Sequence, residues 1–208
     1  MVAAHSVTLD GLAGRPIEVE VDIANGLPTT IIVGLADTTI NEARNRVRSA
    51  VVNSGMTWPD QRVTINLAPS TLPKSGSHYD LAIAVAMLGS KAQVPTESFA
   101  RTVFLGELAL DGRLRAIRGV LPATLAAAEA GFDTVFVPDI NAAEAQIVTG
   151  MRVVPVRSLR HVMALLRGDD APDDPPVSPL VVAATDDWAS SQRVDQLDLA
   201  DVVGQTDG

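Results

Sequence analysis

The reactive side chains of this sequence gather in one short segment, residues 74–80. The segment supplies an amine, two hydroxyls, an imidazole, a phenol and a carboxylate, from Lys74, Ser75, Ser77, His78, Tyr79 and Asp80. Ser77, His78 and Asp80 have the residue types of a hydrolytic triad, and Lys74 beside Ser75 or Ser77 has those of a Ser–Lys dyad. A triad is defined by geometry, and residues this close in sequence rarely face one another in the required order. We therefore expect an interaction loop and assign no catalytic residue.

Metal and phosphate chemistry have weaker signals. His5, His78 and His161 are far apart in sequence and show no ligand spacing. The sequence contains no cysteine, which excludes disulfides and thiolate ligands and favours a reducing cytoplasm. It also contains no G-x-x-x-x-G-K-[ST] phosphate loop. We expect no metal and no cofactor in this chain. For His78, two interpretations stay open: a structural side chain, or one whose charge changes near physiological pH and alters a subunit contact.

The elements around the reactive segment can be predicted from its flanks. Residues 63–67 alternate apolar and polar, which is typical of a half-buried strand. Pro69, Pro73 and Gly76 then indicate a turn. From Asp80 onward the chain is apolar on every side, which predicts a helix buried inside a layered core, with Asp80 near the positive end of its dipole.

The rest of the chain predicts strands alternating with helices. The expected strands are 5–9, 17–23, 30–33, 134–137 and 152–156, with a hairpin of 102–110 and 113–116 around Asp111-Gly112. The expected helices are 39–53, 120–131, 141–148 and 159–166. This alternation predicts a layered α/β (α+β) domain. The 39–53 helix carries Arg44, Arg46 and Arg48 on its polar faces. They form either a solvated surface or a candidate DNA or subunit contact.

The charge distribution separates a body from a tail. Residues 169–208 hold ten aspartates and one arginine, and they account for the whole formal net charge of −9. The remaining body is neutral, so it lacks the electrostatic footprint of a strong nucleic-acid binder. We predict a folded domain over residues 1–167 and a flexible acidic Pro/Asp-rich linker over 168–208. The longest apolar run, residues 81–88, is too short to span a bilayer, and no signal peptide is evident.

The central segment resembles the active-site segment of Lon-type serine–lysine proteases, which carry P-K-D-G-P-S-A-G between a strand and a buried helix. The chain keeps Pro73, Lys74 and Gly76, and His78 stands at the position of the nucleophilic serine. The lysine of that family lies in a G-G-L-K turn, and its position here is Leu121. Leucine can neither accept nor donate a proton, so the resemblance implies that both members of the dyad are missing.

Residues 1 to about 167 are more similar to the N-terminal domain of the YifB/ComM family of magnesium-chelatase-like AAA+ ATPases. The matching motifs are N-G-L-P at 25–28, I-V-G-L at 32–35, E-A-R-N-R-V-R-S-A at 42–50, N-L-A-P at 66–69, Y-D-L at 79–81 and G-E-L at 106–108. Residues 198–205 resemble the run-in to an ATPase module in that family.

That resemblance implies a ribosomal-protein-S5-domain-2-like, Lon-protease-like fold without catalytic activity of its own. It also implies a hexameric ring ATPase, with ATP and Mg²⁺ held in an adjoining ATPase module, acting on DNA as a branch-migration helicase in recombination and natural transformation. The expected partners of this domain are its own ATPase module, neighbouring subunits and DNA, with no membrane. Two alternatives stay open: a peptidase using Ser77 or Lys74, and an autonomous DNA-binding module using Arg44 and Arg48.

Overall fold

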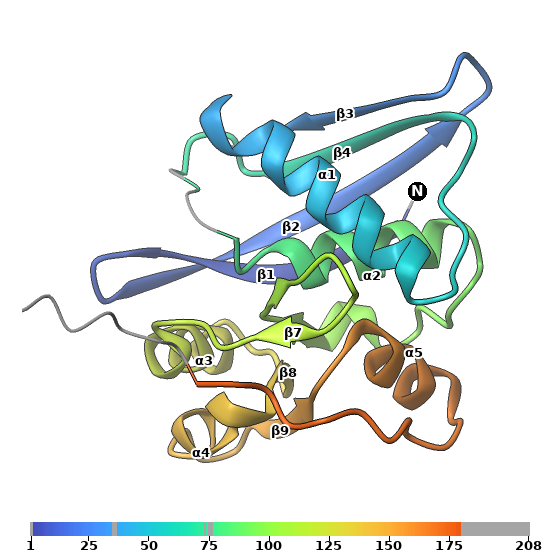
Figure 1. The fold of residues 1–208 in the computed structure, drawn as a ribbon. Helices are drawn as coiled ribbons and strands as arrows, with labels where there is room; N and C mark the ends of the chain where they lie inside the picture. Colours follow the sequence, from blue (N-terminus) through green and yellow to red (C-terminus); the bar gives the residue numbers. More distant parts are fainter. Residues whose placement is uncertain (1, 35–36, 73, 75–76, 180–208) are drawn as a thin grey trace, which may run out of the picture.

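A mixed seven-stranded sheet forms the centre of the molecule (Figure 1). The structure is a computed structural model that describes residues 2–34, 37–72, 74 and 77–179, with the side chains of 37–41 excepted. The strands are β1 (Val2–Asp10), β2 (Ala13–Ala24), β3 (Thr29–Val33), β4 (Arg62–Ala68), β5 (Thr102–Phe104), β8 (Thr134–Pro138) and β9 (Arg152–Val156). Their order across the sheet is β3-β4-β2-β1-β5-β8-β9. Strands β6 (Glu107–Leu108) and β7 (Leu114–Arg115) form a separate small hairpin.

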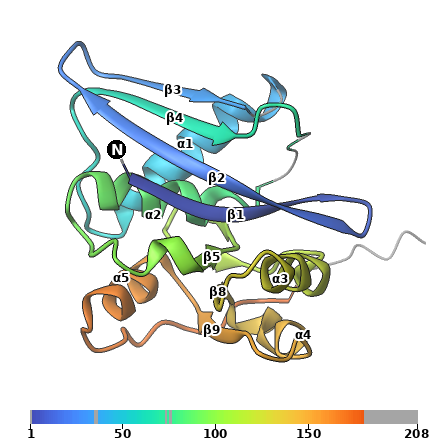
Figure 2. The ribbon, with the colours of Figure 1, turned by 180° about the vertical axis from the view of Figure 1, so that it is seen from behind.

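Helices cover the two faces of the sheet unequally. They are α1 (Asp37–Asn53), α2 (Asp80–Ser90), α3 (Val120–Glu129), α4 (Ala142–Ala145) and α5 (Leu159–Arg167), with short 3₁₀ turns η1 (Phe99–Arg101) and η2 (Asp139–Asn141). One core cluster joins α1, α2 and α5 to one face of the sheet. The other cluster joins α3 and α4 to the opposite face of β1, β5 and β8. Seen from behind, β2, β4 and β3 carry no helix over most of their length (Figure 2).

The alternation in β2 explains why that half of the sheet can stay uncovered. Val19 and Val21 are fully buried under α2, whereas Glu18 and Asp22 are exposed on the opposite face. Because successive side chains of a strand point to opposite faces, an antiparallel sheet with this pattern needs only one covered face. The long pairing of β2 with β1 and with β4 fixes this register along the strand. The strands predicted at 5–9, 17–23, 30–33 and 63–67 are confirmed.

Helix α2 is the most deeply buried element, as its composition predicted. Every residue from Asp80 to Gly89 is buried. Leu81, Ile83 and Met87 are among the largest fully buried side chains. A helix without a polar face is stable only between other layers, and α2 lies between the sheet and α1. The predicted buried helix is therefore confirmed.

Three local predictions need correction. The predicted arm 102–110 is divided: β5 pairs with β1 and β8 in the main sheet, and only β6 forms the hairpin with β7. The split occurs at Gly106, where a side chain would lie 2.7 Å from Leu114 Cδ2. Helix α1 begins at Asp37, ahead of the predicted start at residue 39. The predicted helix 141–148 is only the four-residue α4 preceded by η2.

Packing continues past residue 167, where the domain was predicted to end. Asp174 is buried at the start of α5, where it bonds to Ser158 and Arg160, and Val177 is buried in the main core cluster. The backbone N–H of Val177 donates to Asp139 Oδ1 over 3.0 Å. The described part of the acidic tail, up to residue 179, therefore includes a segment docked on the domain. The predicted layered α/β class is confirmed by the mixed sheet and its helices.

Candidate functional site

A buried ion pair holds the start of α2 against α1. Asp80 is 1% exposed and receives two hydrogen bonds from Arg46, Nε to Oδ2 at 2.6 Å and Nη2 to Oδ1 at 3.1 Å. The backbone N–H of Leu108 adds a third bond to Oδ2 at 3.2 Å. Burial raises the pKa of Asp80 to about 6, against the opposing effect of Arg46. Hydrogen bonding to Asp80 raises the pKa of Arg46. The carboxylate thus connects α1, α2 and β6.

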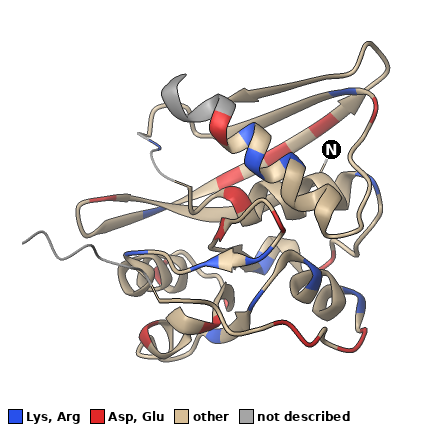
Figure 3. Ribbon diagram, in the orientation of Figure 1, with Lys and Arg blue, Asp and Glu red and all other residues tan. Residues whose placement is uncertain are grey.

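This pairing separates the three arginines that were predicted as one contact surface. Arg46 points inward to Asp80, whereas Arg44 and Arg48 line a surface pocket on another side of α1. Successive helix residues are about 100° apart, so positions 44 and 48 share a face and position 46 does not. The basic positions lie along the middle of α1 in Figure 3. A candidate contact can therefore include Arg44 and Arg48, but Arg46 has a structural partner.

His78 and Tyr79 anchor the same turn to the sheet. His78 Nε2 lies 3.0 Å from the carbonyl oxygen of Val7, and the His78 ring packs against Tyr79 at a centroid distance of 4.0 Å. The Tyr79 hydroxyl donates to Thr8 Oγ1 over 3.0 Å. Burial lowers the pKa of His78 below its usual 6.5, so the ring is neutral at pH 7. This shift weakens the hypothesis that His78 changes its charge near physiological pH.

Ser77 belongs to a polar chain with Glu107 and Arg115. Its hydroxyl donates to Glu107 Oε2, and Glu107 Oε1 accepts from Arg115 Nη1 over 3.1 Å. The Ser77 hydroxyl is thus bonded to a carboxylate that already has an arginine partner, whereas the Lys74 amine donates to backbone carbonyls. The arrangement therefore orients the Ser77 hydroxyl rather than activating it as a nucleophile.

Lys74 is buried without a carboxylate partner among the described residues. Its ammonium group donates to the backbone carbonyls of Pro69 and Leu72, the second over 3.2 Å. Burial lowers the pKa of Lys74. The amine closes the turn between β4 and α2, and its hydrogen-bond partners are carbonyls rather than Ser77. Ser75, the other predicted loop serine, lies outside the described residues.

The two positions that match the Lon dyad are occupied by groups of a different kind. His78 is held by the Val7 carbonyl, as above. Leu121 is in the first turn of α3, where its backbone N–H donates to Glu144 Oε1 over 3.0 Å. Neither position presents a hydroxyl or an amine. In the described part of the chain no three His, Cys, Asp or Glu side chains are grouped as a metal site would require. None of the helices described there is long and apolar enough to cross a membrane.

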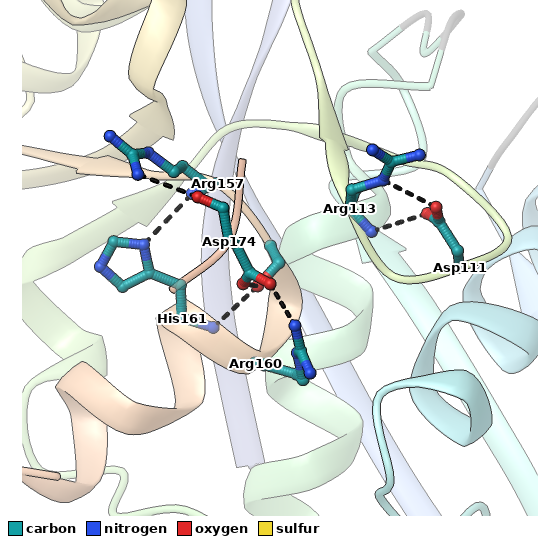
Figure 4. Close-up of polar contacts among 7 residues, drawn as sticks. Asp111, Arg113, Arg157, Arg160, His161 and Asp174 are labelled. Atoms are coloured by element: carbon teal, nitrogen blue, oxygen red, sulfur yellow. Dashed lines mark hydrogen bonds and ion pairs between the residues drawn. The ribbon is translucent and has the colours of Figure 1, made fainter. Parts of the chain in front are cut away.

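A second polar cluster was missed in the sequence (Figure 4). Asp174, 3% exposed, accepts from the Ser158 hydroxyl and from Arg160 Nη2, and its carbonyl accepts from Arg157 Nη1 over 2.9 Å. Ser158 also caps α5 by accepting from the backbone N–H of His161 at 3.0 Å. Burial alone would raise the pKa of Asp174, but the hydrogen bonds from Ser158 and Arg160 lower it. Ser158 before an apolar run was a readable cap signal, whereas its pairing with Asp174 had no local signature. Glu107 was missed for the same reason.

Comparison with known proteins identifies the family. The family described as subunit ChlI of Mg-chelatase matches residues 19–141, more than half of the chain. The chain belongs to the ChlI family. The matched range begins in β2 and ends in η2, so it includes the Arg46–Asp80 pair and the turn that carries His78.

Relatives of this ChlI-family chain match it along almost its whole length. An uncharacterised protein of Mycobacterium tuberculosis is 45% identical over 203 residues, covering 98% of this chain and 38% of the relative. The uncharacterised protein YifB of Escherichia coli is 38% identical over 204 residues, with the same coverages. The competence protein ComM of Haemophilus influenzae is 34% identical over 195 residues, covering 94% and 37%. The predicted similarity to YifB and ComM is thereby confirmed.

A more distant likeness supports the Lon-like part of the fold. The Lon protease of Xanthomonas oryzae is 25% identical over 166 residues, covering 74% of this chain and 19% of that protease. The chain spans less than two fifths of the length of the YifB and ComM relatives. Any activity of a full-length protein of this family can therefore be assigned to this chain only as a proposal.

Proposed function

We propose that this chain is a non-catalytic platform domain of a YifB/ComM-type ring ATPase. In this proposal the domain assembles or guides a hexameric ATPase that acts on DNA as a branch-migration helicase in recombination and transformation. ATP and Mg²⁺ bind in a separate module, since the sequence has no G-x-x-x-x-G-K-[ST] loop. A cytoplasmic location belongs to the same proposal.

The observation that carries this proposal is the state of the Lon-like turn. The position of the nucleophile holds His78, whose ring is engaged with the Val7 carbonyl, and the position of the lysine holds Leu121. A Ser–Lys dyad needs a hydroxyl and an amine within hydrogen-bond reach. Here Ser77 donates to Glu107, while Lys74 donates to the carbonyls of Pro69 and Leu72. Ser77, His78, Tyr79 and Asp80 are hydrogen-bonded to other elements, and Lys74 is hydrogen-bonded to carbonyls of the turn itself, as a structural turn requires.

The non-catalytic part of the proposal can be tested on the purified chain. The chain is incubated with an unfolded protein and, separately, with a fluorophosphonate that labels reactive serines. We expect neither cleavage nor labelling, and no difference between the wild type and Ser77→Ala or Lys74→Ala. Cleavage that disappears in Ser77→Ala would establish the peptidase alternative instead.

The platform part requires the full-length protein. Its mass in solution, its ATP hydrolysis and its branch migration on a synthetic four-way DNA junction are compared with those of a protein lacking residues 1–179. We expect ATP hydrolysis to persist and branch migration to be lost. Equal branch migration by the two proteins would contradict a platform role, whatever the result of the peptidase assay.

A further inference from the structure

A polar pocket lies between α1, the loop before β4 and the start of β3. Its volume is about 280 Å³. It is lined by two arginines, a tryptophan and several amide and hydroxyl side chains, in the set Pro28, Thr29, Thr30, Arg44, Asn45, Arg48, Trp58, Pro59, Asp60 and Gln61. The pocket lies apart from the Arg46–Asp80 pair, since none of the residues of that pair or of the turn 74–80 lines it.

The described lining of the pocket carries a net positive charge, from two arginines and one aspartate. Arg44 and Arg48 make no ion pair with any described residue, whereas six arginines elsewhere in the described chain each meet a carboxylate. Asp60 is the one acidic side chain among the described residues that line the pocket. Two guanidinium groups one helical turn apart can hold the oxygens of one phosphate group, because each offers a fork of N–H donors.

Trp58 gives the pocket an aromatic wall beside this charge. Its side chain is partly buried, packs against the main core cluster and also lines the pocket. An indole fixed in this way offers a stacking surface to a planar ring at little cost in side-chain entropy.

The loop that carries Trp58 is held in place from both ends. The Gln61 side chain donates to Asn25 Oδ1 over 3.2 Å and accepts from Lys91 Nζ at 3.2 Å. The N–H of Thr57 donates to Gln93 Oε1 over 3.1 Å, and Gln93 Nε2 returns a bond to the Thr57 carbonyl at 2.9 Å. A wall that is ordered before binding costs less entropy on binding than a mobile loop.

We propose that this pocket binds a nucleotide unit, with its phosphate on Arg44 and Arg48 and its base against Trp58. The unit is either a free nucleotide or one residue of a single strand, because the chemistry of recognition is the same for both. Phosphate contacts and base stacking require no particular sequence, so the site is indifferent to base identity. The inference rests on the described pocket alone and does not depend on the platform proposal, whose tests concern the turn and the ATPase module.

The test uses the fluorescence of Trp58 in the full 208-residue chain. The sequence has two tryptophans, Trp58 and Trp188, so Trp188→Phe leaves Trp58 as the reporter. This protein is titrated at low salt with AMP, adenosine, inorganic phosphate and a ten-residue oligothymidylate. We expect saturable quenching by AMP or the oligonucleotide, and much weaker binding of adenosine and of phosphate. Tighter, salt-sensitive binding of the oligonucleotide identifies a strand, whereas equal affinities identify a free nucleotide.

Four variants define the site. Arg44→Ala and Arg48→Ala should each weaken binding by roughly tenfold or more, as the loss of a charge-assisted bond predicts. Asp60→Asn should strengthen it, because a repelling charge is removed. The matched control is Arg118→Ala, an exposed arginine that does not line the pocket, which should bind as the wild type does.

The stacking role of Trp58 is measured by calorimetry. Trp58→Leu keeps an apolar side chain but removes the ring, and should weaken nucleotide binding about fivefold or more while leaving phosphate binding unchanged. Circular dichroism and thermal melting confirm that each variant is folded. The proposal is overturned if no nucleotide binds, if adenosine binds as well as AMP, if phosphate binds as tightly as AMP, or if Arg44→Ala and Arg118→Ala behave alike.

Discussion

Asp80 links α1, α2 and β6 by hydrogen bonds, although burying its carboxylate is unfavourable. Its removal from water is unfavourable, and the two bonds from Arg46 and one from Leu108 only partly offset that cost. The result is a pKa of about 6, well above the ordinary value of 3.8. The residue therefore exchanges its proton near pH 6 in the folded chain.

We predict that this proton makes the stability contribution of Asp80 fall as pH rises. The folded chain keeps the proton up to about pH 6, whereas the unfolded chain releases it near 3.8. Between these two pKa values the folded state binds more protons than the unfolded state. The stability that the bound proton provides is therefore fully present below pH 3.8 and is lost as the pH rises through about 6. The expected change is about 3 kcal/mol.

The measurement is the free energy of unfolding by urea at several pH values between 3.5 and about 7, for the wild type and Asp80→Asn. The difference between the two proteins should change across this range in favour of the variant as pH increases. A difference independent of pH would show that the pKa of Asp80 is the same in the folded and unfolded chains.

The residue types in the turn were predictable, but their partners were not. The reactive segment 74–80 can be recognised from its composition, and the resemblance to Lon-type proteases places His78 and Leu121 at the positions of the dyad. The pairing of Asp80 with Arg46 spans 34 positions, and that of Ser77 with Glu107 spans 30. Contacts of such separation depend on how α1, α2 and β6 pack, which no local pattern encodes. The helical period alone predicts that residues 44 and 46 lie on different faces of the helix.

At the scale of elements, the segment that follows α5 behaves as part of the domain. Its anchor is Asp174, which is bonded by Ser158, Arg157 and Arg160, and a second attachment joins Val177 to Asp139. Ser158 both caps α5 and donates to Asp174, so the start of the helix and the docked segment stabilise each other.

We predict that Asp174→Ala releases this segment and destabilises the domain by about 1–3 kcal/mol, because Ser158 and Arg160 lose a buried acceptor. Amide hydrogen exchange of residues 172–178 should become faster, together with that of the first turn of α5. The matched control is Asp173→Ala, since Asp173 is exposed and adjacent. Equal exchange in the two variants would mean that Asp174 does not hold the segment.

Most elements were predictable because their hydrophobic period was clear. Strands β2 and β4 alternate apolar and polar side chains, and α2 is apolar on all sides. The split of the 102–110 arm was missed because β5 and β6 are three and two residues long, too short for a period to appear. The docked tail was missed because its proline and aspartate content is typical of linkers.

At the scale of the whole molecule, charge is distributed unequally between the two sides of the sheet. Arg44 and Arg48 lie on α1, which covers one face of the sheet. Glu18, Glu20 and Asp22 lie along β2 on the opposite, uncovered face, and red positions follow β2 in Figure 3. Glu20 also accepts from Asn66 Nδ2 over 2.7 Å. The body has no net charge by composition, but Arg44 and Arg48 and the carboxylates of β2 lie on opposite sides of the sheet.

We predict that removing acidic charges from the uncovered face of β2 strengthens nucleotide binding less than removing the acidic charge of Asp60 from the pocket. Glu18→Gln with Asp22→Asn removes two charges, yet at 0.15 M salt the affinity for oligothymidylate should change by less than about twofold, since both side chains are exposed on the face opposite α1 and salt screens exposed charges over a Debye length of about 8 Å. Asp60→Asn, which removes one charge inside the pocket, should have the larger effect. A larger gain from the double variant would place the strand on the β2 face instead.

The bare side of the sheet has a consequence for the direction from which a polyanion can approach. A nucleic-acid strand passing close to β2 meets a row of carboxylates, whereas one passing over α1 meets the guanidinium groups of Arg44 and Arg48, which form no ion pair with a described residue. If the pocket binds a strand as proposed, this charge distribution favours approach over α1 and requires no base-specific contact. Several copies set in the same orientation would present one repelling surface and one attracting surface.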